Sequence, residues 1–142
     1  MKKGLSEEKR ERNMSLGVKE GSAVTVTTII TDTYMTPFAL AIGGNSMHIG
    51  FLNSFSGLLA PLSQLYGSKI MDKWQRKKLM VLSASWQTLV LLPILILGIL
   101  AISNIGAWFP HLLILFYSLY VIFGALAGLA WFSLMGDIVP QE

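Results

Sequence analysis

The chain contains no cysteine and little charge. Only 13% of its 142 residues are Asp, Glu, Lys or Arg, about half of the roughly 25% that is typical of a soluble domain. Without cysteine, the chain has no disulfide and no thiolate ligand for a metal ion. Residues 79–136 contain no Asp, Glu, Lys or Arg, and a soluble protein with so long an uncharged segment would expose a large apolar surface. The composition therefore predicts a membrane protein in contact with the lipid bilayer.

The sequence patterns of an enzyme are also missing. There is no nucleophile paired with a base, no phosphate-binding loop and no metal-binding cluster, and His48 and His111 lie far apart in the sequence. We therefore predict no enzymatic activity and no cofactor, and we interpret both histidines as interfacial residues. The net charge of +3 does not indicate nucleic acid binding, because the cations flank apolar segments instead of covering a soluble domain.

Four mostly apolar segments are long enough to cross a bilayer, because a transmembrane helix needs about 20 residues. They cover approximately residues 22–42, 49–67, 79–103 and 112–135. We therefore predict an all-α membrane protein with a four-helix transmembrane region over residues 22–136. Residues 1–21 would form an N-terminal arm, either with a short helix from Glu7 to Arg12 or disordered, and residues 137–142 a short end.

The distribution of positive charge predicts the orientation in the membrane. All 11 Lys and Arg residues lie either in the arm or between the second and third segments. Cytoplasmic loops accumulate Lys and Arg, whereas external loops do not. The pattern predicts a multi-pass protein of the inner or plasma membrane with both termini in the cytoplasm. The uncharged turns at residues 43–48 and 104–111 would face outward.

Asp32 is the acid that this topology places at membrane depth. An unpaired carboxylate there costs about 2.5 to 3.5 kcal/mol, so Asp32 is expected to face a cavity or to be protonated. Thr25, Thr28 and Thr36 share its helical face at spacings of three and four, and their hydroxyls are its expected partners. Asp32, Thr28 and Thr36 are therefore candidates for a substrate or ion pathway. The alternative is that Asp32 only fixes helix packing.

The other segments contribute weaker signals. Asn53 and Gln64 lie on a polar stripe of the second segment, and such amides either join the pathway or connect helices. The third segment is almost wholly apolar beyond Gln87 and is expected to face lipid. Gly124 and Gly128 form a GxxxG spacing, which predicts close helix packing. The four tryptophans are expected to be interfacial anchors.

The segment between the second and third spans resembles a known signature. Residues 68–80 read Ser-Lys-Ile-Met-Asp-Lys-Trp-Gln-Arg-Lys-Lys-Leu-Met, which is similar to Gly-x-Leu-Ala-Asp-Arg-x-Gly-Arg-Arg/Lys-x-x-Leu of the major facilitator superfamily. Asp72, Lys73, Arg76 and Lys77 match its charged positions, whereas Ser68 and Gln75 replace its glycines. The resemblance implies that these four charged residues form a latch between the two halves of a transporter at the cytoplasmic face.

The resemblance extends over the four predicted spans and implies the first third of a major facilitator fold. The expected function is then transport of a small solute, together with the remaining helices of a larger transporter or with a second subunit. In that case the chain is expected to be a fragment or one partner of a split transporter. The alternative is a self-contained four-helix membrane protein, either a homo-oligomeric small exporter or a non-transporting assembly subunit. The long charged arm and the basic loop argue against the small exporter.

Overall fold

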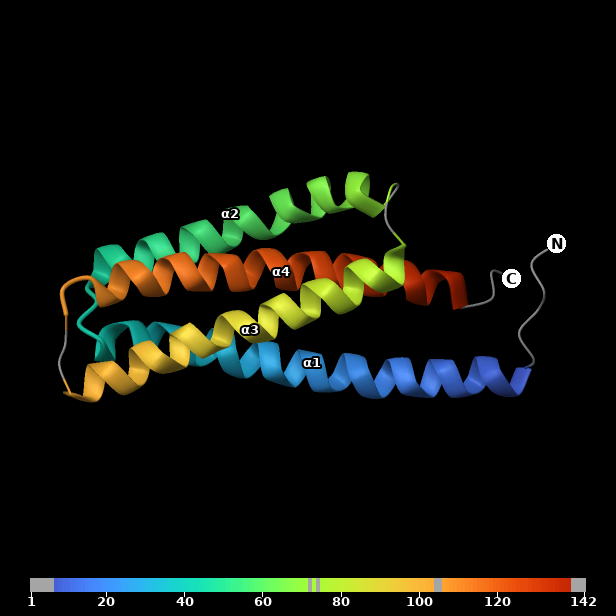
Figure 1. Cartoon of the computed structure of the whole chain (residues 1–142), viewed down its shortest axis with the longest axis horizontal. Helices are drawn as coiled ribbons and strands as arrows, with labels where there is room; N and C mark the ends of the chain where they lie inside the picture. The colour runs from blue at the N-terminus through green and yellow to red at the C-terminus, as the bar shows by residue number, and fades with distance from the viewer. Residues whose placement is uncertain (1–6, 72, 74, 104–105, 139–142) are drawn as a thin grey trace.

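The computed structural model describes residues 7–71, 73, 75–103 and 106–138, and every regular element within these ranges is a helix (Figure 1). The four helices are α1 (Glu7–Ala41), α2 (Ser46–Met71), α3 (Arg76–Ser103) and α4 (Phe109–Ile138). The prediction of an all-α fold is therefore confirmed.

Two of the described helices are long and apolar enough to cross a membrane, namely α3 over Arg76–Ser103 and α4 over Phe109–Gly136. Only 17% of the most apolar window of each is buried within the chain, whereas a core helix of a soluble protein would be mostly covered by its own fold. Helices α1 and α2 are long enough to cross a membrane, but their mean hydropathy is lower than that of α3 and α4. Threonines, serines and amides interrupt their apolar residues. The first and second predicted spans thus have the length of membrane helices without their apolar composition.

Helix α1 begins much earlier than the predicted first span. It runs without interruption from Glu7 to Ala41, so the described part of the expected arm continues directly into the span. Gly17 and Gly21 allow α1 to approach α4 there. A Cβ atom at Gly17 would lie 2.8 Å from the Met135 Sδ atom, and one at Gly21 would lie 3.0 Å from the Trp131 ring.

The helix connections are short. Helix α1 ends at a turn in which Gly43 has a φ of 89°, a conformation that glycine adopts at little cost. Asn45 then caps α2, since its Oδ1 atom accepts the His48 backbone N–H at 3.1 Å. The α2–α3 connection is shorter than the predicted basic loop of residues 68–78, because α2 continues to Met71 and α3 begins at Arg76.

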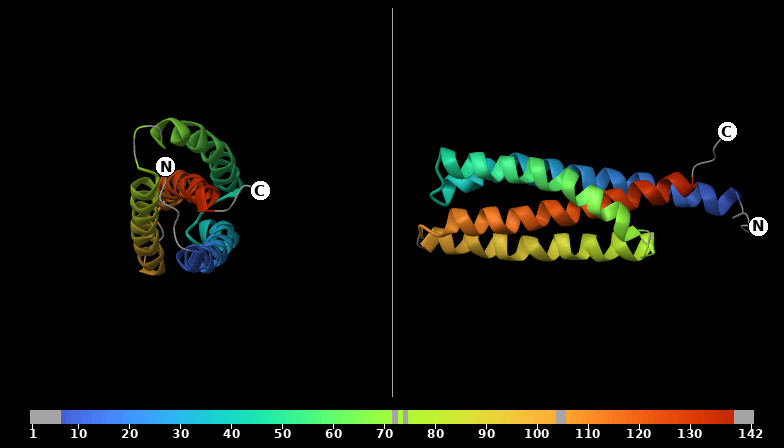
Figure 2. Two further views of the ribbon diagram at one scale, coloured as in Figure 1. Left: turned by 90° about the vertical axis from the view of Figure 1, so that its right-hand side faces the viewer. Right: turned by 90° about the horizontal axis from the view of Figure 1, so that it is seen from above.

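Helix α4 lies at the centre of the bundle and packs against all three other helices (Figures 1 and 2). Its contacts with α2 and α3 are extensive, whereas those with α1 are few. The α1–α2 and α3–α4 connections lie at one end of the bundle, which we call the turn end. The beginning of α1, the α2–α3 connection and the end of α4 lie at the other, the loop end (Figure 1).

The hydrophobic core occupies the half of the bundle nearer the turn end. Leu113 and Ile42 have 0% and 1% of their surface exposed. Val90 and Ile94 of α3 are buried in this core, whereas Leu92, Leu95 and Ile99 of the same helix are exposed, so α3 has one packed stripe and one exposed face. The buried core cluster consists of Met35, Ala39, Ile42, Leu52, Val90, Ile94, Leu113, Tyr117 and Tyr120.

Candidate functional site

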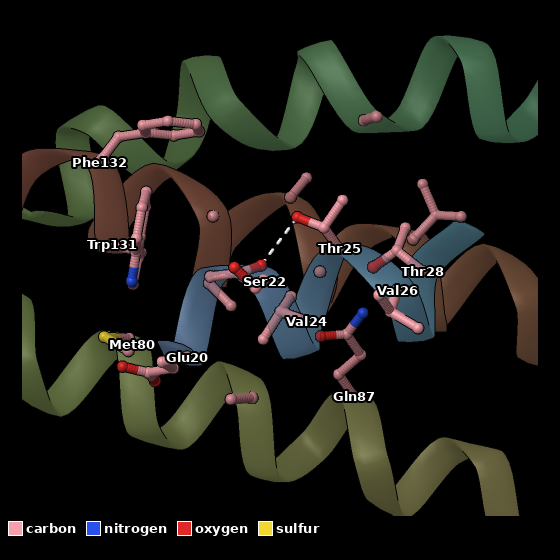
Figure 3. Close-up of a pocket in the computed structure, with 18 of the residues that line it drawn as sticks. Glu20, Ser22, Val24, Thr25, Val26, Thr28, Met80, Gln87, Trp131 and Phe132 are labelled. Carbon is pink, nitrogen blue, oxygen red and sulfur yellow. Dashed lines mark hydrogen bonds between the residues drawn. The ribbon is translucent and has the colours of Figure 1, made fainter. Parts of the chain in front are cut away.

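A cavity of about 910 Å³ occupies the half of the bundle nearer the loop end (Figure 3). Its walls come mainly from α1, α3 and α4, and α2 contributes Ala60 and Gln64. Along α1 the lining runs from Gly17 to Asp32, which is about 22 Å at 1.5 Å per residue. The cavity is therefore an elongated groove along α1 that ends at Asp32, beside the packed half.

Small side chains create this space. Helix α4 faces the cavity with Gly124, Ala125, Ala127 and Gly128, and α1 with Gly17 and Gly21. A Cβ atom at Gly124 would lie 2.6 Å from the Gln87 Nε2 atom, whereas one at Gly128 would meet nothing within 4 Å. Gly124 thus lies against the Gln87 side chain of α3, whereas Gly128 faces the open cavity.

Asp32 has a partner that the sequence pattern did not indicate. The Tyr117 hydroxyl of α4 donates a hydrogen bond of 2.7 Å to the Asp32 Oδ1 atom. This length is typical of a strong bond to a carboxylate. Tyr117 is 6% exposed and belongs to the core cluster, and its ring stacks on Tyr120 with centroids 5.9 Å apart. The hydrogen bond therefore joins the inner end of the cavity to the packed half.

The threonines of α1 do not hydrogen-bond Asp32, contrary to expectation. The Thr25 Oγ1 atom donates to the Gly21 carbonyl oxygen at 2.8 Å, and Thr31 donates to the Thr27 carbonyl oxygen at 2.9 Å. Such bonds to the carbonyl four residues earlier are a common way for threonine to satisfy its hydroxyl inside an apolar helix. Of the two threonines that line the cavity, Thr25 has its hydroxyl engaged by the Gly21 carbonyl oxygen, whereas Thr28 has no hydrogen bond among the described residues.

Two residues of the cavity wall were predicted from the sequence to lie elsewhere. Gln87, in the span expected to face lipid, is half-buried and lines the cavity between α1 and α3. Trp131, expected to be an interfacial anchor, also lines it, and its Nε1 atom is buried without a hydrogen-bond partner in the described structure. In Figure 3 that nitrogen points toward the side of the cavity where Met80 and Glu20 lie.

The predicted pathway residues are only partly brought together. Asp32, Thr28 and Gln64 line the cavity from two helices. Thr36 is half-buried one turn beyond Asp32, and Asn53 is exposed on α2, and neither lines the cavity. The polar residues that line the cavity are Glu20, Ser22, Thr25, Thr28, Asp32, Gln64, Gln87 and Tyr120.

The predicted latch residues lie at the loop end. Lys73 and Lys77 are exposed, and the Arg76 Nη1 atom donates to the Ser133 carbonyl oxygen of α4 at 3.5 Å. Arg76 therefore connects the start of α3 to the last turns of α4. Asp72, the acid of this motif, lies outside the described residues.

The two histidines, distant in the sequence, meet at the turn end. Their ring centroids lie 4.8 Å apart in an edge-to-face arrangement, and the His48 Nδ1 atom is 2.8 Å from the Asn45 Oδ1 atom. The described residues contain no group of three or more His, Cys, Asp or Glu residues able to hold a metal ion. The pair therefore packs the α1–α2 turn against the start of α4.

In comparisons with known proteins, no family model, no curated protein and no solved structure matches the chain.

Proposed function

We propose that the chain crosses the membrane with all four helices and acts in solute transport as the first part of a major-facilitator-like secondary transporter. The observation that carries the proposal is the cavity. Thr28, Asp32, Gln64 and Gln87 come from three helices and converge on one space of about 910 Å³. Cavities of about 300 to 1,000 Å³ are typical of sites for small molecules. Asp32, an acid within a proposed membrane-spanning helix, lines this cavity, and acids in such positions are typical of substrate or ion pathways in membrane proteins.

The outer surface supports a membrane location for all four helices. On α3, Leu92, Leu95 and Ile99 are each at least 50% exposed, and on α1 so are Ile29 and Ile30. Water would be a poor solvent for these faces, whereas hydrocarbon chains would cover them without cost. Helix α2, with 26 residues, is about 39 Å long at 1.5 Å per residue, which exceeds the roughly 30 Å of a bilayer core.

The unequal packing of the two halves supports a transport mechanism. At the turn end the core seals the bundle, whereas the cavity extends along α1 toward the loop end. Helix α1 makes fewer contacts with α4 than α2 and α3 do, and its buried residues Met35, Ala39 and Ile42 lie in the core near the turn end, so the cavity-lining half of α1 is its more loosely packed half. Transport would then proceed by rocking of helices about a solute bound near Asp32, with access changing from one end to the other.

The sequence motif at the loop end fits the same proposal. In the family that residues 68–80 resemble, this loop holds the two halves together at the cytoplasmic face. The Arg76 contact with Ser133 at 3.5 Å already ties the α2–α3 connection to the end of α4, which lines the outer part of the cavity. The position of Lys73, Arg76 and Lys77 at the loop end supports the latch role that the resemblance implies.

The proposal is tested by asking whether the cavity contains water in a membrane. Because the chain has no cysteine, a single cysteine at Thr28 reports on the cavity wall, and a cysteine at the adjacent exposed Thr27, which does not line the cavity, is the matched control. In liposomes permeabilised so that a hydrophilic thiol reagent reaches both sides, we expect rapid labelling of Thr28→Cys and slow labelling of Thr27→Cys, which would face lipid.

Equal, slow labelling at both positions would show that the groove is closed or filled with lipid and would contradict a solute pathway. Equal, rapid labelling would show that α1 is surrounded by water and would contradict the four-span arrangement. Circular dichroism of both variants provides the control for folding, since each must retain the helix content of the unmodified chain.

A further inference from the structure

We infer that the cavity selects an amphipathic organic cation. This inference rests on the proposed transport function, because it names the class of solute for the same cavity. It follows from the charges on the wall, from the free hydrogen-bonding capacity of Asp32 and from the apolar and aromatic surface around it.

The charge on the cavity wall has one sign. Glu20 and Asp32 line the cavity, and none of its described lining residues is Lys, Arg or His. The two acids are twelve positions apart on α1, which is about 18 Å at 1.5 Å per residue. They therefore lie near the outer and inner ends of the groove. A solute cation in the groove would be attracted by both carboxylates, whereas an anion would be repelled by both.

Asp32 retains the capacity to bind a cation. Its Oδ1 atom accepts the Tyr117 hydroxyl at 2.7 Å, and its Oδ2 atom has no hydrogen-bond partner among the described residues. A carboxylate has about four acceptor positions, so one bond from Tyr117 orients the group without saturating it. The tyrosine thus fixes one oxygen and leaves the other available to a cation.

The remaining wall favours an organic cation over a hydrated inorganic ion. Most lining residues are apolar, including Val24, Met80 and Ala84. Tyr120, Trp131 and Phe132 add aromatic surface, and aromatic faces attract cations, tryptophan most strongly. A solute with apolar groups and one positive charge would use both parts of this wall.

A neutral polyhydroxylated solute fits less well, because it needs many free hydrogen-bonding groups. The Ser22 and Thr25 hydroxyls already donate to the Val18 and Gly21 carbonyl oxygens, each at 2.8 Å. Gln64 and Gln87 are the side-chain amides that line the described cavity. Two amides and few free hydroxyls along a long apolar groove leave most of the hydroxyls of such a solute unpaired.

The test compares two probes of nearly equal shape and opposite charge, tetraphenylphosphonium and tetraphenylborate, by equilibrium dialysis against the full chain in lipid nanodiscs. Empty nanodiscs correct for partitioning into lipid. We expect saturable binding of the cation only. Asp32→Asn should weaken it about tenfold or more, equivalent to about 1.4 kcal/mol, and Asp32→Glu should retain most of it.

A variant that is expected to bind the cation more tightly separates an effect on binding from a loss of folding. Gln64→Glu adds an acid inside the cavity and should tighten binding of the cation, whereas Asn53→Asp adds an acid on the same helix outside the cavity and should leave the affinity unchanged. Equal affinity for both probes, or equal effects of the two added acids, would overturn the inference. If Thr28→Cys is labelled as expected while the cation does not bind, the solute class is wrong and the pathway stands.

Discussion

The two halves of the bundle are built from the same helices and differ in the size of the side chains that face inward. Near the turn end, α4 presents Leu113, Tyr117 and Tyr120, which are almost completely buried. Nearer the loop end the same helix presents glycine and alanine, and the facing part of α1 presents glycine and threonine. Large residues fill the half near the turn end, whereas the small residues of α4 from Gly124 to Gly128 leave space in the other half, where Trp131 and Phe132 also form part of the wall. The position of the cavity is therefore encoded by residue volume along α4 and α1.

The largest effect is expected in the packed half. Leu113 is 0% exposed, whereas Leu115 of the same helix is 54% exposed. Leu113→Ala should lower the free energy of unfolding by about 2 to 5 kcal/mol, because it removes apolar contacts and leaves a void. Leu115→Ala should change it by less than about 1 kcal/mol. Unfolding in mixed micelles, followed by circular dichroism, measures both. Similar losses for the two variants would contradict the described core.

A smaller effect is expected at the boundary between the halves. Tyr117→Phe removes the hydroxyl that donates to Asp32 and leaves the carboxylate without that partner, which should cost about 1 to 3 kcal/mol. Tyr120→Phe is the matched control, because Tyr120 stacks on Tyr117 and makes no hydrogen bond among the described residues. If the two variants lose equal stability by the same unfolding measurement, the Asp32 contact does not join the halves.

The smallest effect is expected in the open half, where two glycines have different surroundings. Gly128→Ala should stabilise α4 by up to about 1 kcal/mol, because alanine favours helix and the new methyl group meets open space. Gly124→Ala should gain less, since its Cβ would meet Gln87 at 2.6 Å. The difference in thermal stability should disappear when Gln87→Ala is added. A gain at Gly124 equal to that at Gly128 without this second change would show that Gln87 does not restrict the site.

The helices were predictable because each depends on local pattern. Runs of about 20 apolar residues and the Gly and Asn residues of the turns predicted four helices and their order. Their limits were less predictable. The α1 helix continues back to Glu7 because its charged first turns tolerate helix as well as coil. The α2–α3 connection is short because Ser68 and Lys69 extend α2 where the resemblance suggested a loop.

The cavity was only partly predictable, because it depends on contacts between distant segments. Asp32 and Thr28 were recognisable from their spacing on one helix. The partner of Asp32 is Tyr117, 85 positions away, and no spacing rule connects the two. Gln87 gave a usable signal as the amide in an otherwise apolar segment, and it lines the cavity. Trp131 was predicted to be an interfacial anchor, because a tryptophan near a helix end usually has that role. Nothing in its position along the helix indicated that it lines the cavity.

The central claim is that the open half faces the side of the basic loop and that the packed half seals the opposite side. Single cysteines at Gln87, Lys77 and Asn45 test it most directly, when a membrane-impermeant thiol reagent is applied separately to intact cells and to inside-out vesicles. We predict that Gln87→Cys and Lys77→Cys react in the vesicles and that Asn45→Cys reacts in the cells. Labelling of Gln87→Cys from the same side as Asn45→Cys would contradict the account.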